Sequence, residues 1–172
     1  MLKDALQVVN QMQADRVIRK YAIGGAIGAL FYLEPVLTKD IDIFVMLPTV
    51  PDTTILSLSK IYEYLQDRSF TVQDEYVVIN DWPVQFLPAT TPLELEAVEQ
   101  AVLAESEGVK SSVMTAEHLL AICLQTGRAK DFARVVQFIE QEVIDMTKLL
   151  PILERHGLSA KWQIFKRRFL RE

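Results

Sequence analysis

The sequence predicts an α/β fold of the α+β type, in which a small mixed sheet with flanking helices is followed by a C-terminal helical part. Two observations support this. Short strand-like apolar runs alternate with helical periodicity in the first half, whereas the pattern from Pro92 onward is mostly helical. The 172 residues, 50% of them hydrophobic, suffice for one core with an appendage but not for two large independent domains. We expect an α/β core over 1–112 and a helical part over 113–172 packed on it, which can also be counted as one domain.

The first part of the chain alternates between helix and strand. Apolar residues recur at helical spacing, Gly24-Gly25 interrupts the second element, and Pro35 ends the third. Threonines after Pro51 are candidate N-caps. The expected elements are a helix over 4–19, a strand over 21–23, a helix over 26–33, a strand within 38–47, and a helix from Thr53 or Thr54 to about 67.

The rest of the chain reads as a few strands followed by helices. Asn80-Asp81 marks a turn between two strands, and glycines punctuate the helical region. The expected strands are 70–72, 76–79, 84–87 and, as a short addition, 109–113. The expected helices are near 92–105, 115–126, 129–141, 145–156 and 159–170.

Composition excludes several classes of protein. A net charge of −5 argues against a protein whose whole surface binds nucleic acid, so any such contact must be a local patch. A single cysteine, Cys123, allows no intramolecular disulfide, and with only His118 and His156 beside it a Cys/His metal site lacks ligands. The longest apolar run, Tyr21–Leu33, is shorter than the roughly 20 residues that span a membrane. We expect a cytoplasmic protein with no membrane partner.

Asp40 and Asp42 are the strongest candidate site. Residues two apart on a strand share one face, with Cα atoms about 6.6 Å apart. Two such carboxylates can hold Mg²⁺, which prefers oxygen ligands and binds through one or two carboxylates plus substrate phosphates. The alternative is a strand with one solvated face. However, aspartate is depleted in strands, and like charges on one face repel each other.

The Gly24-Gly25 turn strengthens the functional interpretation. It lies between an expected strand and an expected helix, upstream of the acidic pair. Glycine lets backbone amides approach a phosphate closely, and a helix N-terminus adds partial positive charge. A tight turn alone would explain a Gly-Gly pair. A glycine turn for phosphates followed by carboxylates for their metal is the more specific combination.

These two motifs resemble those of a known superfamily. Residues 21–26 and 38–43 are similar to the Gly-Gly/Ser and Asp-x-Asp signature of DNA-polymerase-β-like nucleotidyltransferases, especially the bacterial minimal and abortive-infection (AbiEii-like) branch. Residues 116–121 and 127–131 resemble the helical motif of that branch.

The resemblance implies a nucleotidyltransferase-like core that moves a nucleoside monophosphate from an NTP to an acceptor. It also implies Mg²⁺ as the cofactor, with Mn²⁺ as a substitute. Gly24 and Gly25 would bind phosphates, and Asp40 and Asp42 would be the catalytic metal ligands. The acceptor is unknown, with RNA and protein as candidates, and the branch implies a toxin–antitoxin partner.

The chain departs from the superfamily at two positions. The family supplies a third carboxylate from a later strand, but the matching residue here is Gln85, which cannot accept a proton at neutral pH. Asp81, on the turn before that strand, is an alternative if the turn folds inward. Cys123 stands where relatives often place a lysine, and we expect it to be a small buried hydrophobic residue. Gln85 therefore favours a second hypothesis, a degenerate module that binds nucleotide or a partner without catalysis.

Several cations accompany the acidic pair. Arg128 and Lys130 could reach a triphosphate, with Asp131 orienting one of them, although Gly127 and Asp131 are equally typical of helix ends. Lys39 adjoins the acidic pair, where it could bind a phosphate or could simply be a solvated charge. The C-terminal segment combines cations with Trp162, Phe165 and Phe169. Its aromatics should pack on the core, and its basic residues could touch RNA.

Overall fold

The structure is a computed structural model that describes residues 2–34, 38, 40–48 and 57–170. Its centre is a seven-stranded mixed sheet in the order β3-β4-β5-β2-β1-β7-β6. The strand β2 runs parallel to β5, and β1 runs parallel to β7, while the other neighbours are antiparallel. The strands are β1 (Lys20–Ile23), β2 (Ile41–Met46), β3 (Thr71–Gln73), β4 (Tyr76–Ile79), β5 (Trp82–Pro88), β6 (Val102–Ser106) and β7 (Val109–Val113).

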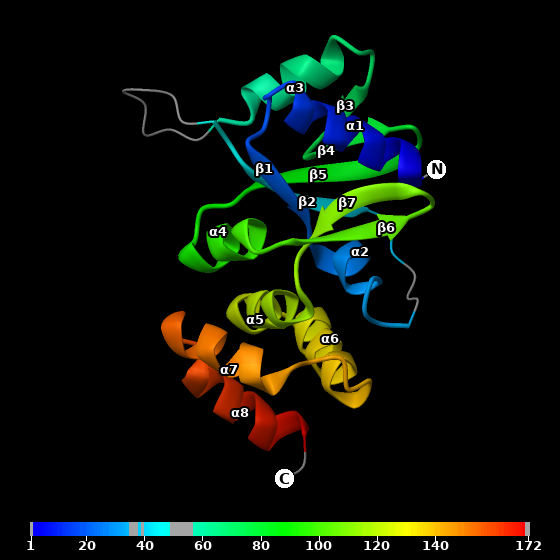
Figure 1. Cartoon of the computed structure of the whole chain (residues 1–172). Helices are drawn as coiled ribbons and strands as arrows, with labels where there is room; N and C mark the ends of the chain where they lie inside the picture. Colours follow the sequence, from blue (N-terminus) through cyan, green and yellow to red (C-terminus); the bar gives the residue numbers. More distant parts are fainter. Residues whose placement is uncertain (1, 35–37, 39, 49–56, 171–172) are drawn as a thin grey trace.

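Helices cover both faces of the sheet. Figure 1 shows α1 and α3 on one side, and α5 to α8 gathered at the opposite end of the molecule near the C-terminus. The helices are α1 (Leu2–Ala14), α2 (Gly25–Ala29), α3 (Ser59–Gln66), α4 (Pro92–Glu99), α5 (Ala116–Thr126), α6 (Ala129–Glu140), α7 (Met146–Arg155) and α8 (Ser159–Phe169). This mixed architecture confirms the predicted fold class.

Two hydrophobic clusters lie on the two faces of the sheet, and β2 contributes to both. Ile41, Ile43 and Val45 pack in the cluster with α1 and α3, whereas Phe44 belongs to the cluster with α4 to α8. Successive side chains of a strand point to opposite faces, so Asp42 shares the face of Phe44. The acidic pair is therefore turned toward the C-terminal helices.

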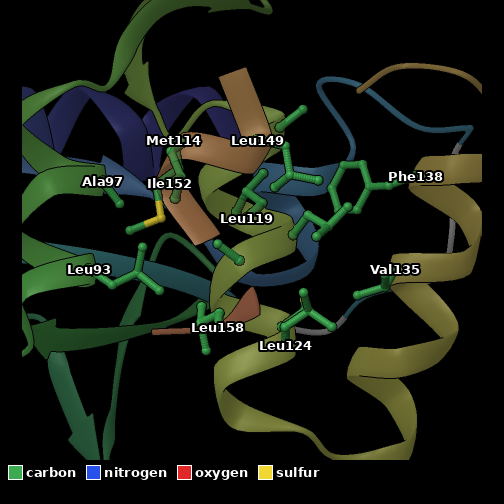
Figure 2. Close-up of a cluster of buried hydrophobic side chains, with 14 of the residues drawn as sticks. Leu93, Ala97, Met114, Leu119, Leu124, Val135, Phe138, Leu149, Ile152 and Leu158 are labelled. Carbon is green, nitrogen blue, oxygen red and sulfur yellow. The ribbon is translucent and has the colours of Figure 1, made fainter. Parts of the chain in front are cut away.

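The cluster on that face joins the helical part to the rest of the chain. Figure 2 shows Leu93 and Ala97 of α4 beside Leu119 of α5, with Phe138 of α6 and Ile152 of α7 completing the cluster. All five side chains are at most 4% exposed. The two parts expected over 1–112 and 113–172 thus share one apolar core.

The structure corrects the prediction for residues 92–105. The helix α4 begins as expected, with a capping box between Thr91 and Glu94, but it ends at Glu99. Residues 102–106 form the edge strand β6, in register with β7 from Val102 opposite Val113. No glycine or proline marks this change from helix to strand. The hairpin turn that reverses the chain lies later, at Gly108, whose φ is +79°.

Other boundaries differ less. The first helix ends at Ala14, before Arg16 with φ of +60°, rather than at residue 19. The helix α2 ends at Ala29 instead of 33. Thr53 and Thr54, the expected caps of the third helix, lie outside the described residues, and α3 begins at Ser59. Among the described helices, none combines the length and apolar character that a bilayer-spanning segment needs.

Candidate functional site

A pocket of about 470 Å³ lies where the Asp42 face of the sheet meets α5 and α6. It brings together most residues singled out from the sequence: Gly25, Asp40, Asp42, Gln85, Arg128 and Lys130 all line it. Gly24 immediately precedes Gly25 in the chain, and Lys39 lies outside the described residues. Residues from four separate stretches of sequence therefore converge on one concave site.

The glycine turn lies against Asp42. The amide of Gly24 donates a hydrogen bond to the carbonyl oxygen of Asp42, at 2.9 Å. Gly25 has φ of +56°, and a Cβ atom there would lie 1.7 Å from Asp42 Oδ2. A Cβ atom on Gly24 would come within 2.6 Å of the Phe44 ring. Both positions thus exclude any larger residue, which explains the Gly-Gly pair by packing as well as by backbone conformation.

The two carboxylates occupy different environments. Asp42 lies on β2, whereas Asp40 comes just before the strand and not within it. The Asp40 carboxylate accepts long hydrogen bonds from Thr38 Oγ1 and Tyr76 Oη, both at 3.4 Å. Burial raises the pKa of Asp42, and the nearby charge of Asp40 raises it further, against the opposing charges of Lys130, Arg134 and Arg128. The pocket therefore places cations where they stabilise a negative charge on Asp42.

Gln85 occupies the position next to Asp42 across the sheet. In the parallel β2–β5 pair Asp42 is opposite Gln85, and in the β4–β5 pair Gln85 is opposite Tyr76. The three side chains form a row on one face of the sheet, and all line the pocket. Asp81 does not take the place of the third carboxylate, because it lies in the β4–β5 turn and lines a different hollow with Asp4 and Gln7.

The basic side of the pocket is built by the start of α6. Arg128, its N-cap, donates from Nε and Nη2 to Asp131 at 2.7 and 3.2 Å, and the same carboxylate accepts from the Arg128 amide. Asp131 is only 2% exposed, so it fixes both the helix end and the guanidinium. Asp131 therefore caps the start of α6 and also orients the guanidinium of Arg128.

Several pocket residues, among them Arg134, Glu75 and Tyr76, were missed in the sequence. Arg134 follows Lys130 by four positions, so both project from one face of α6 toward the pocket. The four-residue spacing of Lys130 and Arg134 is visible in the sequence, but it does not show that this face of α6 lines the pocket. Glu75 and Tyr76 also line the pocket, and their places depend on strand pairing, which short motifs do not encode. Cys123 is buried as expected, and burial raises the pKa of its thiol to about 11, so it is not a nucleophile at neutral pH.

The donors of the pocket fit a hard divalent cation held with help from a substrate. Asp40 and Asp42 offer carboxylate oxygens, and Gln85 offers an amide oxygen. Within the described residues, no group of three or more His, Cys, Asp or Glu side chains is arranged to hold a metal by itself. Mg²⁺ commonly binds through one or two carboxylates together with substrate phosphates, and this donor set matches that pattern.

Comparison with known proteins supports the fold. No family model matches the chain, and no curated protein matches it. Among solved structures, an antigenic nucleotidyltransferase-like protein from Paracoccidioides brasiliensis has a TM-score of 0.66 at 14% identity, covering 98% of this chain and 88% of that one. The chain therefore has a nucleotidyltransferase-like fold, as the resemblance of its motifs implied. Its place in the AbiEii-like branch stays a prediction.

Two further structural resemblances are weaker. One is to ANT(2″)-Ia in complex with adenylyl-2″-tobramycin, with a TM-score of 0.47 at 12% identity, covering 96% of this chain and 98% of that one. The other is to CdnC of E. coli MS115-1 with ATP, with a TM-score of 0.36 at 18% identity, covering 81% of this chain and 47% of that one.

Proposed function

We propose that the protein transfers a nucleoside monophosphate from an NTP to an acceptor hydroxyl, with Mg²⁺ or Mn²⁺ as cofactor. The observation that carries this proposal is the composition of the pocket. A glycine turn in contact with Asp42 lies at one side, and the cations Arg128, Lys130 and Arg134 lie at the other. A triphosphate with its divalent cation needs this pairing, because carboxylates bind the metal and cations neutralise the phosphates.

Each residue has a distinct role in this proposal. Asp40 and Asp42 would hold the cation, which when bound neutralises charge on the phosphates and aligns them for transfer. Gly24 and Gly25, which pack directly against Phe44 and Asp42, would let the backbone of the turn approach the phosphates closely. Arg128, already oriented by Asp131, would face the charge that develops on the departing phosphates.

The proposed transfer forms one bond at the α-phosphorus and breaks another. The acceptor hydroxyl oxygen forms a bond to the α-phosphorus while the bond from that phosphorus to the bridging oxygen breaks, and pyrophosphate leaves. The hydroxyl proton goes to water, because the amide of Gln85 cannot accept it. This lack of a base at the Gln85 position predicts a slower reaction than one with a third carboxylate.

A second candidate function is nucleotide binding without transfer, which Gln85 specifically favours. The neutral amide beside Asp42 replaces a charged metal ligand and removes a proton acceptor from the row across the sheet. The toxin–antitoxin partner rests on the resemblance to the AbiEii-like branch alone.

The two functions are separated by one experiment. The purified protein is incubated with each of the four α-labelled NTPs, Mg²⁺ or Mn²⁺, and total RNA and protein, beside an Asp40→Ala/Asp42→Ala variant. We expect label in one acceptor fraction, absent with the variant. Metal-dependent NTP binding by calorimetry without incorporation would favour the binding module. Absence of both binding and incorporation would contradict both functions.

A further inference from the structure

A second hollow lies between α6 and α8, on the other side of α6 from the pocket around Asp42, which we call the nucleotide pocket. Two adjoining cavities of about 290 and 580 Å³ share Phe132, Arg168 and Phe169 in their walls. The rings of Phe132 and Phe169 have centroids 5.5 Å apart, and Phe165 lies 4.9 Å from Phe169. Phe169 is 37% exposed and Ile164 is 57% exposed. We call this hollow the aromatic groove.

The charge of the aromatic groove is entirely positive. Lys161 and Arg168 are the only ionisable side chains among the described residues that line it. The helix α8 carries four cations and no acidic residue, although the whole chain has a net charge of −5. The guanidinium of Arg168 lies over the Phe169 ring, 5.1 Å from its centroid. The groove thus combines flat apolar faces with cations at its rim.

The aromatic groove adjoins the nucleotide pocket. Thr126, at the end of α5, lines both. The start of α6 separates them, because Lys130 and Arg134 line the pocket while Phe132 lines the groove. A chain molecule lying in the groove would therefore have its end next to the pocket.

We propose that the aromatic groove binds single-stranded nucleic acid, whose end is the acceptor of the transferred nucleotide. Bases would stack on Phe132 and Phe169, and phosphates would pair with Lys161 and Arg168. Aromatic rings that line a groove beside cations are how proteins bind single strands without reading sequence. An anionic partner without flat rings would gain nothing from the aromatic lining. The role as acceptor rests on the proposed function, whereas the binding does not.

The binding is tested by fluorescence anisotropy with a labelled single-stranded RNA of about 12 nucleotides, near the usual site size. We expect Phe169→Ala to weaken binding roughly tenfold, because it removes one aromatic surface on which a base would stack. Phe169→Leu keeps an apolar side chain without a flat face and should weaken binding similarly. Arg168→Gln should weaken it and lower the slope of log affinity against log salt by about 1.

Matched controls use exposed residues elsewhere on the surface. Leu103→Ala removes a side chain 75% exposed on β6, and Lys60→Gln removes an exposed cation on α3. Both should leave RNA affinity unchanged. The proposal is overturned if the RNA does not bind at low salt, if the controls lose as much affinity as the groove variants, or if Phe169→Leu binds normally. It is also overturned if an acidic peptide or an anionic vesicle binds the groove as tightly as RNA does.

Measurements of RNA binding and of label incorporation distinguish a wrong assignment of the groove from a wrong proposed function. Asp42→Asn should bind RNA like the wild type and incorporate no label. RNA binding without any incorporation by the wild type contradicts the proposed function and leaves the groove intact. Incorporation into RNA that is unchanged by Phe169→Ala contradicts the groove as the acceptor site.

Discussion

At the scale of single residues, the candidate site depends on how closely Gly25 approaches Asp42. Replacing Gly25 with alanine forces a side chain into left-handed backbone, which costs about 1–2 kcal/mol, and brings its Cβ atom within 1.7 Å of the Asp42 carboxylate. We expect Gly25→Ala to lose more stability than that and to lose NTP binding. The measurements are urea unfolding and calorimetric titration with each NTP.

Gly108→Ala is the matched control for that substitution. Gly108 has φ of +79°, but a Cβ atom added there would meet no other atom within 4 Å, so alanine fits without a clash. The variant should lose about 1–2 kcal/mol of stability from backbone strain alone and bind NTP normally. Equal effects of the two substitutions would mean that contact with Asp42 is irrelevant to the site.

Gln85 gives a second prediction at this scale. Gln85→Glu adds a carboxylate of similar shape opposite Asp42, on the same face of the sheet. Without metal, repulsion with Asp42 should lower the melting temperature, and Mg²⁺ should restore it, because three carboxylates bind a hard cation more tightly than two. If transfer occurs, incorporation should rise about tenfold or more, within the range of general-base catalysis. A melting temperature that does not respond to Mg²⁺ would exclude Gln85 from the metal site.

The residues of the site differ in how far the sequence predicts them. Gly25 and Asp42 are predicted because each belongs to a short motif of residues close together in the chain. The alternation of side chains along a strand then predicts which face of the sheet carries Asp42. Gln85 was found by the same alternation on a second strand. Arg134 and Tyr76 could not be found, since their roles follow from which helix face and which strand edge pack against β2.

At the scale of elements, Glu96 ties α4 to the helical part. Its carboxylate accepts hydrogen bonds from His118 Nε2 at 3.1 Å, His156 Nε2 at 2.8 Å, and two Arg155 nitrogens at 2.9 and 2.5 Å. A carboxylate only accepts, so His118 carries its proton on Nε2, and its Nδ1 accepts from Thr115. The hydrogen bonds from Arg155 are the largest of the effects that hold the pKa of Glu96 at about 2. Taken alone, the pattern of Glu94, Glu96 and Glu99 predicts a solvated helix face, but Glu96 lies in this network instead.

The Glu96 network predicts a pH-dependent stability. Because the pKa of Glu96 is lower in the folded protein than the ordinary value of 4.5, its stabilisation is complete above pH 4.5 and is lost as the pH falls toward 2. Glu96→Gln should therefore lower the free energy of unfolding by about 2 kcal/mol at pH 7, and by much less near pH 2.5. Urea unfolding of both proteins at the two pH values measures this difference.

Glu99→Gln is the control on the same helix. Glu99 pairs with Arg19 and Lys20, and all three side chains are more than 40% exposed. Exposed ion pairs contribute about 0–1 kcal/mol, so this variant should change stability little at either pH. A loss at Glu99 as large as that at Glu96 would show that partial burial of the network is unimportant.

The wrong prediction of a helix up to residue 105, where the structure has β6, also concerns a single element. Residues 101–104 are apolar or small and continue the periodicity of α4, so nothing local stops the helix. The strand forms because β7 offers a free edge beside β1, and the turn at Glu107-Gly108 supplies two residues with positive φ. The strand β6 pairs only with the neighbouring β7, whose place in the sheet depends on the distant β1, and this tertiary pairing outweighs local periodicity.

At the scale of the whole molecule, the question is whether the residues 1–112 and 113–172 unfold as one unit. The cluster drawn in Figure 2 takes Leu93 and Ala97 from the first part and Leu119 and Phe138 from the second. Opening that cluster would expose large apolar surface on both sides, so neither part should be stable without the other. We therefore expect a single cooperative transition in urea.

The two tryptophans of the chain report on the two parts separately. Trp82 lies on β5, and Trp162 lies on α8, where it is 3% exposed. When tryptophan alone is excited, the fluorescence of Trp82→Phe comes from the helical part, and that of Trp162→Phe comes from the sheet. Within each variant, fluorescence and far-ultraviolet circular dichroism should give the same midpoint and slope in urea, because one shared core admits no folded half. A fluorescence transition of Trp162 that precedes the loss of circular dichroism would instead show that the helical part unfolds first and is a domain of its own.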